Sequence, residues 1–163
     1  MIQNKIWRWP LACALAFSAA AWSEAVSLER NQAEVQAVTF KNPVVWADVP
    51  DPDVIRVGDY FYMVSTTMHL MPGAPVMRSR DLVNWKVISY ALETIPGSQF
   101  DVPLHGKGVW APAIRYHEGE FIIFFPMPDE GIYVVKTKDP WGRWDEPTCL
   151  YKGKGWIDPC PFW

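Results

Sequence analysis

The chain contains an internal repeat, and this repeat sharply narrows the choice of folds. Three dipeptides with proline begin successive units: Asp51-Pro52, Ala111-Pro112 and Asp158-Pro159. In the first two units a short apolar segment, a turn with glycine and an aromatic segment follow, over residues 54–64 and 113–125. Apolar runs joined by a two-residue glycine turn are typical of antiparallel hairpins. The repeat therefore predicts a β-hairpin near the start of each unit.

The later part of each unit also repeats. An outer segment leads into a turn around Asp81 or Asp139, and the turn leads to Trp85 or Trp144 and a last strand. The proline and the aspartate are 29 residues apart in the first unit and 27 in the second. We therefore assign both aspartates to turns rather than to chemistry.

Units of about four strands with a recurring Asp and Trp are typical of β-propeller blades. A β-sandwich is the alternative, but it gives no reason for the same turn at the same offset. We predict an all-β propeller with about two blades in this chain and the start of a third. Because a closed propeller needs at least four blades, we expect the chain to be incomplete, with unpaired edges and an uncovered face.

The composition excludes some partners. The net charge is −3, so the chain lacks the basic surface that nucleic acids or anionic lipids require. Its ten tryptophans suit stacking on sugars, but they suit a β core equally well. A neutral or small partner is expected.

The N-terminal residues have the pattern of a signal peptide. Lys5 and Arg8 precede an apolar stretch over residues 9–22, and small residues follow at a candidate cleavage site. We predict a signal peptide over residues 1–25, a leader over 26–41 and the propeller part over 42–163. The alternative, a membrane anchor, needs a longer apolar stretch. We expect a secreted or periplasmic bacterial protein that has no membrane contact after cleavage.

The repeat also indicates where a site would lie. Asp51, Ala111 and Asp158 precede the three prolines, and first strands of blades line the central channel of a propeller. Two carboxylates would then face one channel, an arrangement that is costly without a functional reason. A single Asp before Pro is more often a turn or cap residue. We interpret Asp53, two residues further, as a structural residue that bonds the amides of its turn.

Four segments together resemble glycoside hydrolase family 43, the β-xylosidase and α-L-arabinofuranosidase family. In chain order they read NPVVWADVPDPDVIRVGDYFYM, MPGAPVMRSRDLVNW, GVWAPAIRYHEGEF and GWIDPCPFW. The resemblance implies a five-bladed propeller of which this chain is an N-terminal fragment. It also implies that the general acid, a Glu on a later blade, lies beyond Trp163, so the chain alone is expected to be inactive.

The resemblance gives roles to four residues. Asp51 would be the general base that activates water, and Asp158 would raise the pKa of the general acid and hold that acid in place. Trp110 would line the sugar-binding pocket. Met71 stands on the loop that forms a pocket wall in this family, and we predict that it contacts substrate.

The expected activity is inverting hydrolysis that releases xylose or arabinose from plant oligosaccharides or polysaccharides, with the choice between the two sugars open. An inverting glycosidase needs two carboxyl groups about 6.5 to 9.5 Å apart, and separate blades can supply that spacing. One alternative is a carbohydrate-binding propeller without catalysis. Another is a five-bladed hydrolase of the fructan or mannoside type, which the Trp-Ala-Pro and Asp-Pro-Cys-Pro sequences disfavour.

We expect no cofactor and no catalytic metal, with a structural calcium ion left open for the complete protein. His69, His105 and His117 lack the spacing of metal ligands. Cys149 and Cys160, which follow the signal segment, either pair in an exported protein or remain free and buried.

Overall fold

The computed structural model describes residues 39–163. The predicted signal peptide and nearly all of the predicted leader lie outside the described residues. Residues from Phe40 to Trp163 form one compact unit. No helix in this part of the chain is long and apolar enough to cross a membrane.

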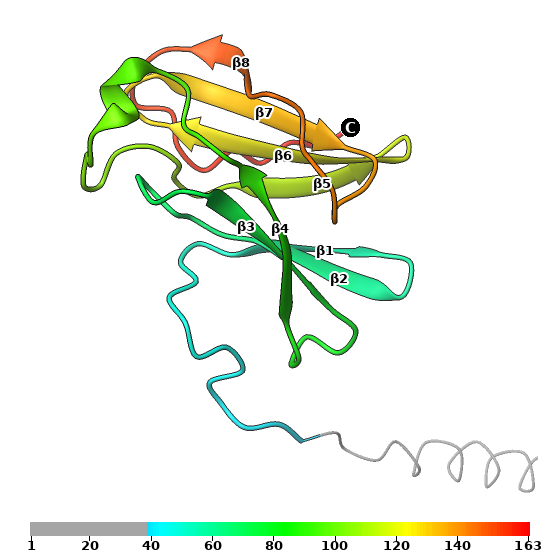
Figure 1. Cartoon of the computed structure of the whole chain (residues 1–163). Coiled ribbons are helices and arrows are strands. Elements are labelled where there is room, and N and C mark those ends of the chain that lie inside the picture. Colours follow the sequence, from blue (N-terminus) through cyan, green and yellow to red (C-terminus); the bar gives the residue numbers. More distant parts are fainter. Residues whose placement is uncertain (1–38) are drawn as a thin grey trace, which may run out of the picture. The chain divides into compact units, whose positions relative to one another are not determined.

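Two four-stranded antiparallel sheets account for the fold (Figure 1). The first, which we call blade 1, has the order β1 (Asp53–Val57), β2 (Tyr60–Val64), β3 (Gly73–Ser79) and β4 (Lys86–Leu92). The second, blade 2, has the order β5 (Ala113–His117), β6 (Glu120–Met127), β7 (Gly131–Thr137) and β8 (Thr148–Lys152). A 3-10 turn, η1 (Ser98–Asp101), lies in the connection between the blades. The prediction of two all-β units is confirmed.

The first hairpin of each blade forms where the sequence predicts it. Val57 pairs with Tyr60 across a two-residue turn that starts at Gly58, whose φ of 59° lies in the left-handed region. His117 pairs with Glu120 across Glu118 and Gly119, which both have positive φ. Such turns match the twist of the paired strands, so local sequence is sufficient to fix both hairpins.

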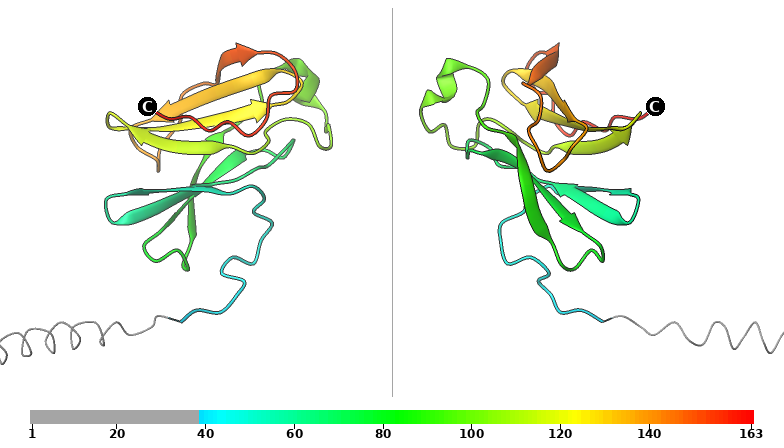
Figure 2. Two further views of the ribbon diagram at one scale, coloured as in Figure 1. Left: turned by 180° about the vertical axis from the view of Figure 1, so that it is seen from behind. Right: turned by 45° about the vertical axis from the view of Figure 1, so that its right-hand side comes forward.

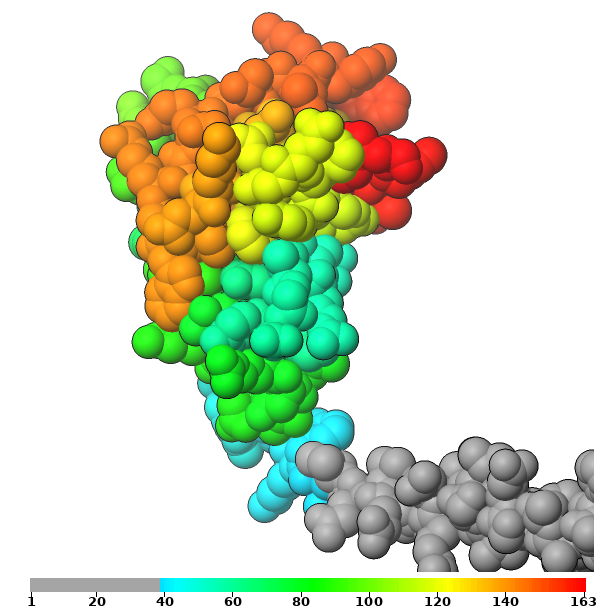
Figure 3. Space-filling model, turned by 90° about the vertical axis from the view of Figure 1, so that its right-hand side faces the viewer, coloured from blue at the N-terminus to red at the C-terminus, as the bar shows by residue number. Residues whose placement is uncertain are grey.

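The two blades share one hydrophobic core. A single cluster of buried side chains contains Val64 and Val76 of blade 1 together with Ile114 and Ile123 of blade 2. The two sheets lie against one another in the further views, and their atoms are in continuous contact on the face drawn in Figure 3 (Figures 2 and 3). Apolar burial between blades, as well as within each sheet, therefore stabilises the unit.

The outer strands of the two blades have different surroundings. Ala91 and Leu92 at the end of β4 are buried, whereas every residue of β8 is exposed. Cys149 on β8 and Cys160 near the C-terminal end are free, and both are exposed. The two thiols are therefore free, but the expectation that free thiols would be buried is wrong. No element of the described chain covers these two positions.

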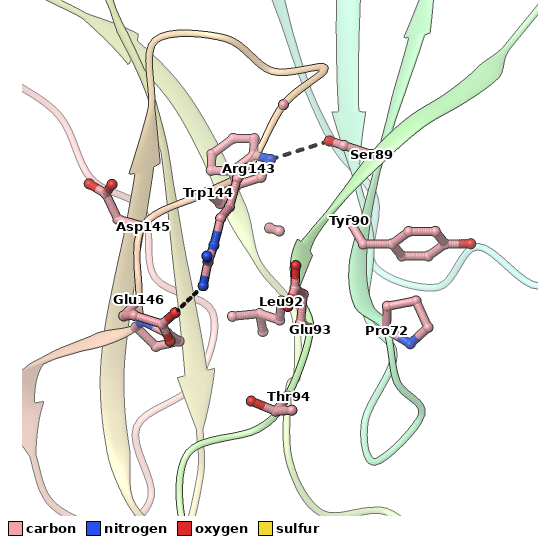
Figure 4. Close-up of a pocket in the computed structure, with 13 residues that line it drawn as sticks. Pro72, Ser89, Tyr90, Leu92, Glu93, Thr94, Arg143, Trp144, Asp145 and Glu146 are labelled. Carbon is pink, nitrogen blue, oxygen red and sulfur yellow. Dashed lines mark hydrogen bonds and ion pairs between the residues drawn. The ribbon is translucent and has the colours of Figure 1, made fainter.

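A groove of about 370 Å³ lies between β4 and the loop before β8 (Figure 4). Ser89 closes one end, because its hydroxyl donates to the carbonyl of Pro140 and accepts from the indole of Trp144. Two of the charged side chains in the groove, Arg143 and Glu146, pair with each other at 2.8 Å. None of the four predicted site residues lines this groove.

Candidate active site

Asp51 lies two residues before β1 in a backbone conformation that few residues adopt. Its φ is 48°, in the left-handed region, where Asp is among the better tolerated residues. The hydroxyl of Thr66 donates to Oδ2 of Asp51 at 2.8 Å, and the amide of Thr66 donates to the carbonyl of Pro50. Thr66 is buried and Asp51 is exposed. The segment after β2 therefore holds one carboxylate oxygen of an otherwise exposed aspartate in place.

Asp158 has a similar φ angle. It precedes Pro159 as Asp51 precedes Pro52, its φ is 51°, and it too is exposed. Ala111, the third residue at this repeat position, does not share the positive φ. Unusual backbone conformations that recur at charged residues are a feature of functional sites. The repeat therefore sets the two aspartates apart from the alanine by conformation as well as by charge.

One arginine connects the segments that follow the two aspartates. The guanidinium of Arg115 donates to Oδ2 of Asp53 at 2.7 Å and, through Nε, to the carbonyl of Pro161 at 2.9 Å. The same oxygen of Asp53 also accepts from the amide of Ile114. We name these contacts the Arg115 clamp. Because Asp53 and Pro161 lie two and three residues after Asp51 and Asp158, the clamp ties both chain segments to the first strand of blade 2.

The clamp agrees with the interpretation of Asp53 as structural, although its partners differ from those expected. We expected Asp53 to bond amides of its own turn, but both of its partners belong to blade 2. The carboxylate and the guanidinium are partly screened by protein, with side-chain exposures of 32% and 24%. A charge-assisted pair with this degree of burial contributes more to positioning than a fully solvated pair does.

Trp110 lines a pocket of about 370 Å³ that does not include Asp51, Asp158 or Met71. Its indole donates to the carbonyl of Gly106 at 2.9 Å, and its amide donates to the carbonyl of Pro126. The other walls come from parts of residues 99–108 and from residues 127–130. We call this cavity the Trp110 pocket. A role for Trp110 in sugar binding stays a prediction.

Met71 is half-buried and packs against the hydrophobic core. Its methyl group occupies the space that a Cβ at Gly73, the first residue of β3, would enter, so a side chain there would require Met71 to move. The core accounts for much of the surface of Met71. Its predicted contact with substrate therefore stays a prediction.

The three histidines contact other aromatic rings. The rings of His69 and His105 meet edge to face at 4.6 Å, and His117 stacks on Trp163 at 4.3 Å. Among residues 39–163, no group of three or more His, Cys, Asp or Glu side chains is placed to hold a metal ion.

Sequence reasoning missed two residues that organise this region, Thr66 and Arg115. A signal for Arg115 was present, because blade 1 has Ile55 at the equivalent repeat position and blade 2 has Ala113 where blade 1 has Asp53. These two departures from the repeat are complementary in charge. Thr66 lies beyond the end of β2 and had no comparable signal.

The chain is similar to known proteins over nearly all of its described residues. The family model described as Glycosyl hydrolases family 43 matches residues 40–163. A putative beta-xylosidase of Xylanibacter ruminicola is 42% identical over 126 residues, which is 77% of this chain and 23% of that protein. The non-reducing end alpha-L-arabinofuranosidase BoGH43B of Bacteroides ovatus is 36% identical over 147 residues, which is 85% of this chain and 25% of that protein.

Solved structures give the same result. The structure described as Bacteroides ovatus Xyloglucan PUL GH43B matches with a TM-score of 0.61 and 37% identity, over 74% of this chain and 24% of that one. A xylan beta-1,4-xylosidase from Bacillus halodurans matches with a TM-score of 0.58 and 27% identity, over 69% and 23%. The chain thus spans about a quarter of the length of the relatives it matches. It belongs to glycosyl hydrolase family 43.

Proposed function

We propose that the protein carrying this chain is an inverting glycosidase that releases xylose or arabinose from plant cell-wall oligosaccharides or polysaccharides. The observation that carries the proposal is the matched conformation of Asp51 and Asp158 before equivalent prolines, with both following segments tied to Arg115. Relatives named as beta-xylosidase and alpha-L-arabinofuranosidase support both sugars equally. The complete fold in this proposal is a five-bladed propeller.

In the proposed mechanism Asp51 is the general base. The Thr66 hydroxyl occupies Oδ2, so Oδ1 accepts the proton of the attacking water. Asp158 acts through the general acid, since a fixed negative charge beside a carboxylic acid raises the pKa of that acid and keeps it protonated. The acid itself comes from a later blade in this proposal, and we expect the chain alone to be inactive. No cofactor takes part.

The first test replaces the two aspartates by asparagine in the full-length protein. Asp51→Asn keeps the shape of the base but cannot accept the proton, so kcat on an aryl xyloside or arabinofuranoside falls by about two to four orders of magnitude. Asp158→Asn shifts the alkaline limb of the pH–rate profile to lower pH, because the acid loses its negative neighbour. Asp139→Asn, in an exposed turn, is the control and leaves both readouts unchanged.

A near-normal rate for Asp51→Asn would contradict the catalytic assignment. The carbohydrate-binding propeller would then become the better hypothesis, and it would require sugar binding that Asp51→Asn leaves intact. The anomer first released, followed by proton NMR, tests inversion separately from the roles of the two aspartates.

We also propose that the protein is exported. The charged, apolar and small-residue order of residues 1–25 supports cleavage before about Ser27. N-terminal sequencing of the protein from culture medium or periplasm tests this, and an intact Met1 would contradict it.

A further inference from the structure

Basic side chains gather at the end of blade 1 that lies away from Asp51. They line a hollow of about 390 Å³ at the start of β2, the end of β3 and the start of β4. These strand ends lie side by side, because Arg78 pairs with Tyr62 on one side and with Lys86 on the other. Asp51 precedes the opposite end of β1, a strand of five residues, so about 16 Å of strand separates it from the hollow. The hollow is therefore distinct from the candidate active site.

Two aromatic rings hold the basic side chains of this hollow together. The guanidinium of Arg78 lies 4.0 Å from the ring centre of Tyr60 and 4.4 Å from that of Trp141, in the outer turn of blade 2. Arg80 lies 4.7 Å from the same tyrosine ring and donates to its hydroxyl. The ammonium of Lys86 is 5.4 Å from the Trp141 ring. Such cation–π contacts offset part of the repulsion among like charges. We name these five residues the Arg78 patch.

Carboxylates of the protein do not neutralise the patch. Within the described residues, Arg78, Arg80 and Lys86 form no ion pair. The one carboxylate that lines the hollow, Asp81, accepts from amides of its own turn. Elsewhere in the fold a cation such as Arg115 does pair with a carboxylate. Most N–H groups of the patch therefore remain available to an anion from outside the protein, and a guanidinium can bind a carboxylate through two parallel hydrogen bonds.

The equivalent positions of blade 2 carry no such excess of positive charge. They are occupied by Glu120, Lys136, Lys138 and Asp145. Two carboxylates thus accompany two cations in blade 2, whereas blade 1 has three cations and a tyrosine. Since both blades form the same four strands, folding of a blade does not require the excess. The net charge of −3, from which we expected a neutral or small partner, gives no sign of this local patch.

The chemistry of the patch suits a sugar that carries a carboxylate. Trp141 is 42% exposed, so part of its ring remains open to the apolar face of a sugar. A volume of about 390 Å³ lies within the range of pockets that hold small ligands. A neutral sugar would leave the three positive charges without a partner, whereas an acidic sugar would supply one at short range.

We propose that the Arg78 patch binds an acidic polysaccharide through the carboxylates of its uronic acid residues. The choice of a carbohydrate rests on the proposed function, but binding at the patch requires no catalysis. Because the patch and Asp51 lie at opposite ends of β1, the polysaccharide bound there leaves the candidate active site open. The patch thus holds the protein on acidic regions of its substrate.

The test compares glucuronoxylan with the same polymer after chemical reduction of its carboxyl groups. The full-length protein with Asp51→Asn, which leaves the polymer intact, is run through native gels that contain either polymer. We expect retardation by glucuronoxylan alone, and this retardation weakens as the ionic strength rises. The Kd follows from retardation at increasing polymer concentration.

Variants then assign the binding to the patch. Arg80→Gln/Lys86→Gln removes two exposed charges and raises the Kd for glucuronoxylan about tenfold. Lys136→Gln/Lys138→Gln is the matched control, because it removes the same charge from exposed positions of blade 2 and changes the Kd less than about twofold. Without Asp51→Asn, the Arg80→Gln/Lys86→Gln protein keeps its kcat/KM on an aryl glycoside.

A second variant concerns the ring shared by two cations of the patch. Trp141→Ala removes the aromatic surface that Arg78 and Lys86 contact, without changing the charge. It raises the Kd for glucuronoxylan about threefold or more, because stacking on the sugar and the positions of both cations are lost. An unchanged Kd for Trp141→Ala together with an unchanged Kd for Arg80→Gln/Lys86→Gln overturns the proposal.

Three further outcomes overturn it. These are equal retardation by native and reduced glucuronoxylan, no retardation by either polymer, and a loss of binding in the blade 2 control that equals the loss in the patch variant. Polyglutamate that binds as tightly as glucuronoxylan would replace the carbohydrate by an acidic peptide as the ligand. If the unmodified protein cleaves no aryl glycoside, the proposed function fails, and the gels still decide whether the patch binds uronic acids.

Discussion

Blade 1 and blade 2 have the same arrangement of strands and turns, but they differ at residues that contact elements outside their own sheet. Both blades pair their strands in the same order, and the second and third strands have the same register, so that Ser79 and Thr137 stand opposite Phe61 and Phe121. The first strands differ, however. Blade 1 begins with Asp51 and Asp53, and blade 2 has alanine at both equivalent positions. The residues that form the strands and turns of a blade therefore recur in both units. Positions where the two units differ indicate residues with a role outside the folding of the blade.

The recurring tryptophans give a second contrast. Trp144 is 5% exposed and donates to Ser89 of the preceding blade. Trp85 has the same place in blade 1, but it donates only to the nearby carbonyl of Leu82 and lines an open apolar groove formed with residues 42–49. The same residue type is thus a boundary residue in one blade and a half-exposed residue in the other.

The largest expected effect on stability comes from replacing these two tryptophans. Trp144→Ala removes a large buried side chain between the blades and lowers the free energy of unfolding by about 3–5 kcal/mol. Trp85→Ala removes a half-exposed side chain and costs less than about 2 kcal/mol. Urea unfolding followed by circular dichroism measures both values. Equal losses would mean that the boundary between the blades contributes no more than the groove beside Trp85.

A smaller effect concerns the Arg115 clamp. Lysine keeps the positive charge, but it cannot donate to Asp53 and Pro161 with the fork geometry of a guanidinium. Arg115→Lys therefore lowers the free energy of unfolding by about 1.5–3 kcal/mol. Arg56→Lys is the matched control, because Arg56 is exposed and its side chain donates only to the carbonyl of Gly58, so about 0.5 kcal/mol or less is expected.

The same urea titration reports on the clamp, and similar losses for the two lysine variants would contradict it. The full-length protein offers a second readout. If the clamp positions the segments that carry Asp51 and Asp158, Arg115→Lys also lowers kcat with little change in KM. Arg56→Lys leaves both kinetic constants unchanged.

The framework was predictable because short-range chemistry determines it. A few adjacent residues determine each turn. These residues correctly predicted both hairpins, at Gly58 and Gly119, and both outer turns, at Asp81 and Asp139. Strand ends were less predictable. The last strand of blade 1 begins directly after Trp85, whereas that of blade 2 begins only at Thr148.

Contacts across the boundary could not be predicted in the same way. Asp53 and Arg115 are 62 residues apart, and their pairing depends on how two blades pack. The Trp110 pocket likewise needs the turn after Met127 to approach the connection around η1. For the site, the repeat identified Asp51 and Asp158 as equivalent positions, and their matching φ values agree with this. The catalytic roles of the two aspartates stay predictions.

The smallest expected effect on stability concerns the two outer turns, which differ in the hydrogen bonds that their aspartates accept. In blade 1, Oδ1 of Asp81 accepts from the amides of Val83 and Asn84 and from the hydroxyl of Ser79. In blade 2, Asp139 accepts with its carboxylate only from the amide of Trp141, within the described residues. These hydrogen bonds hold the pKa of Asp81 well below its usual range, and those from Asn84 have the largest effect. Asp81 is therefore the carboxylate whose charge matters more for stability.

The pH dependence follows from the direction of this shift. A carboxyl group whose pKa is lower in the folded state stabilises the fold above its unfolded pKa of about 3.9, and the contribution is lost as the pH falls below that value. Asn keeps an oxygen acceptor but cannot titrate. Asp81→Asn therefore lowers Tm at pH 7, and the gap to the unmodified protein closes as the pH falls from about 5 to below 3. The Tm gap for Asp139→Asn at pH 7 is smaller. Thermal unfolding across this pH range measures both gaps, and a gap for Asp81→Asn that does not change with pH would show that the charge of Asp81 contributes nothing to the turn.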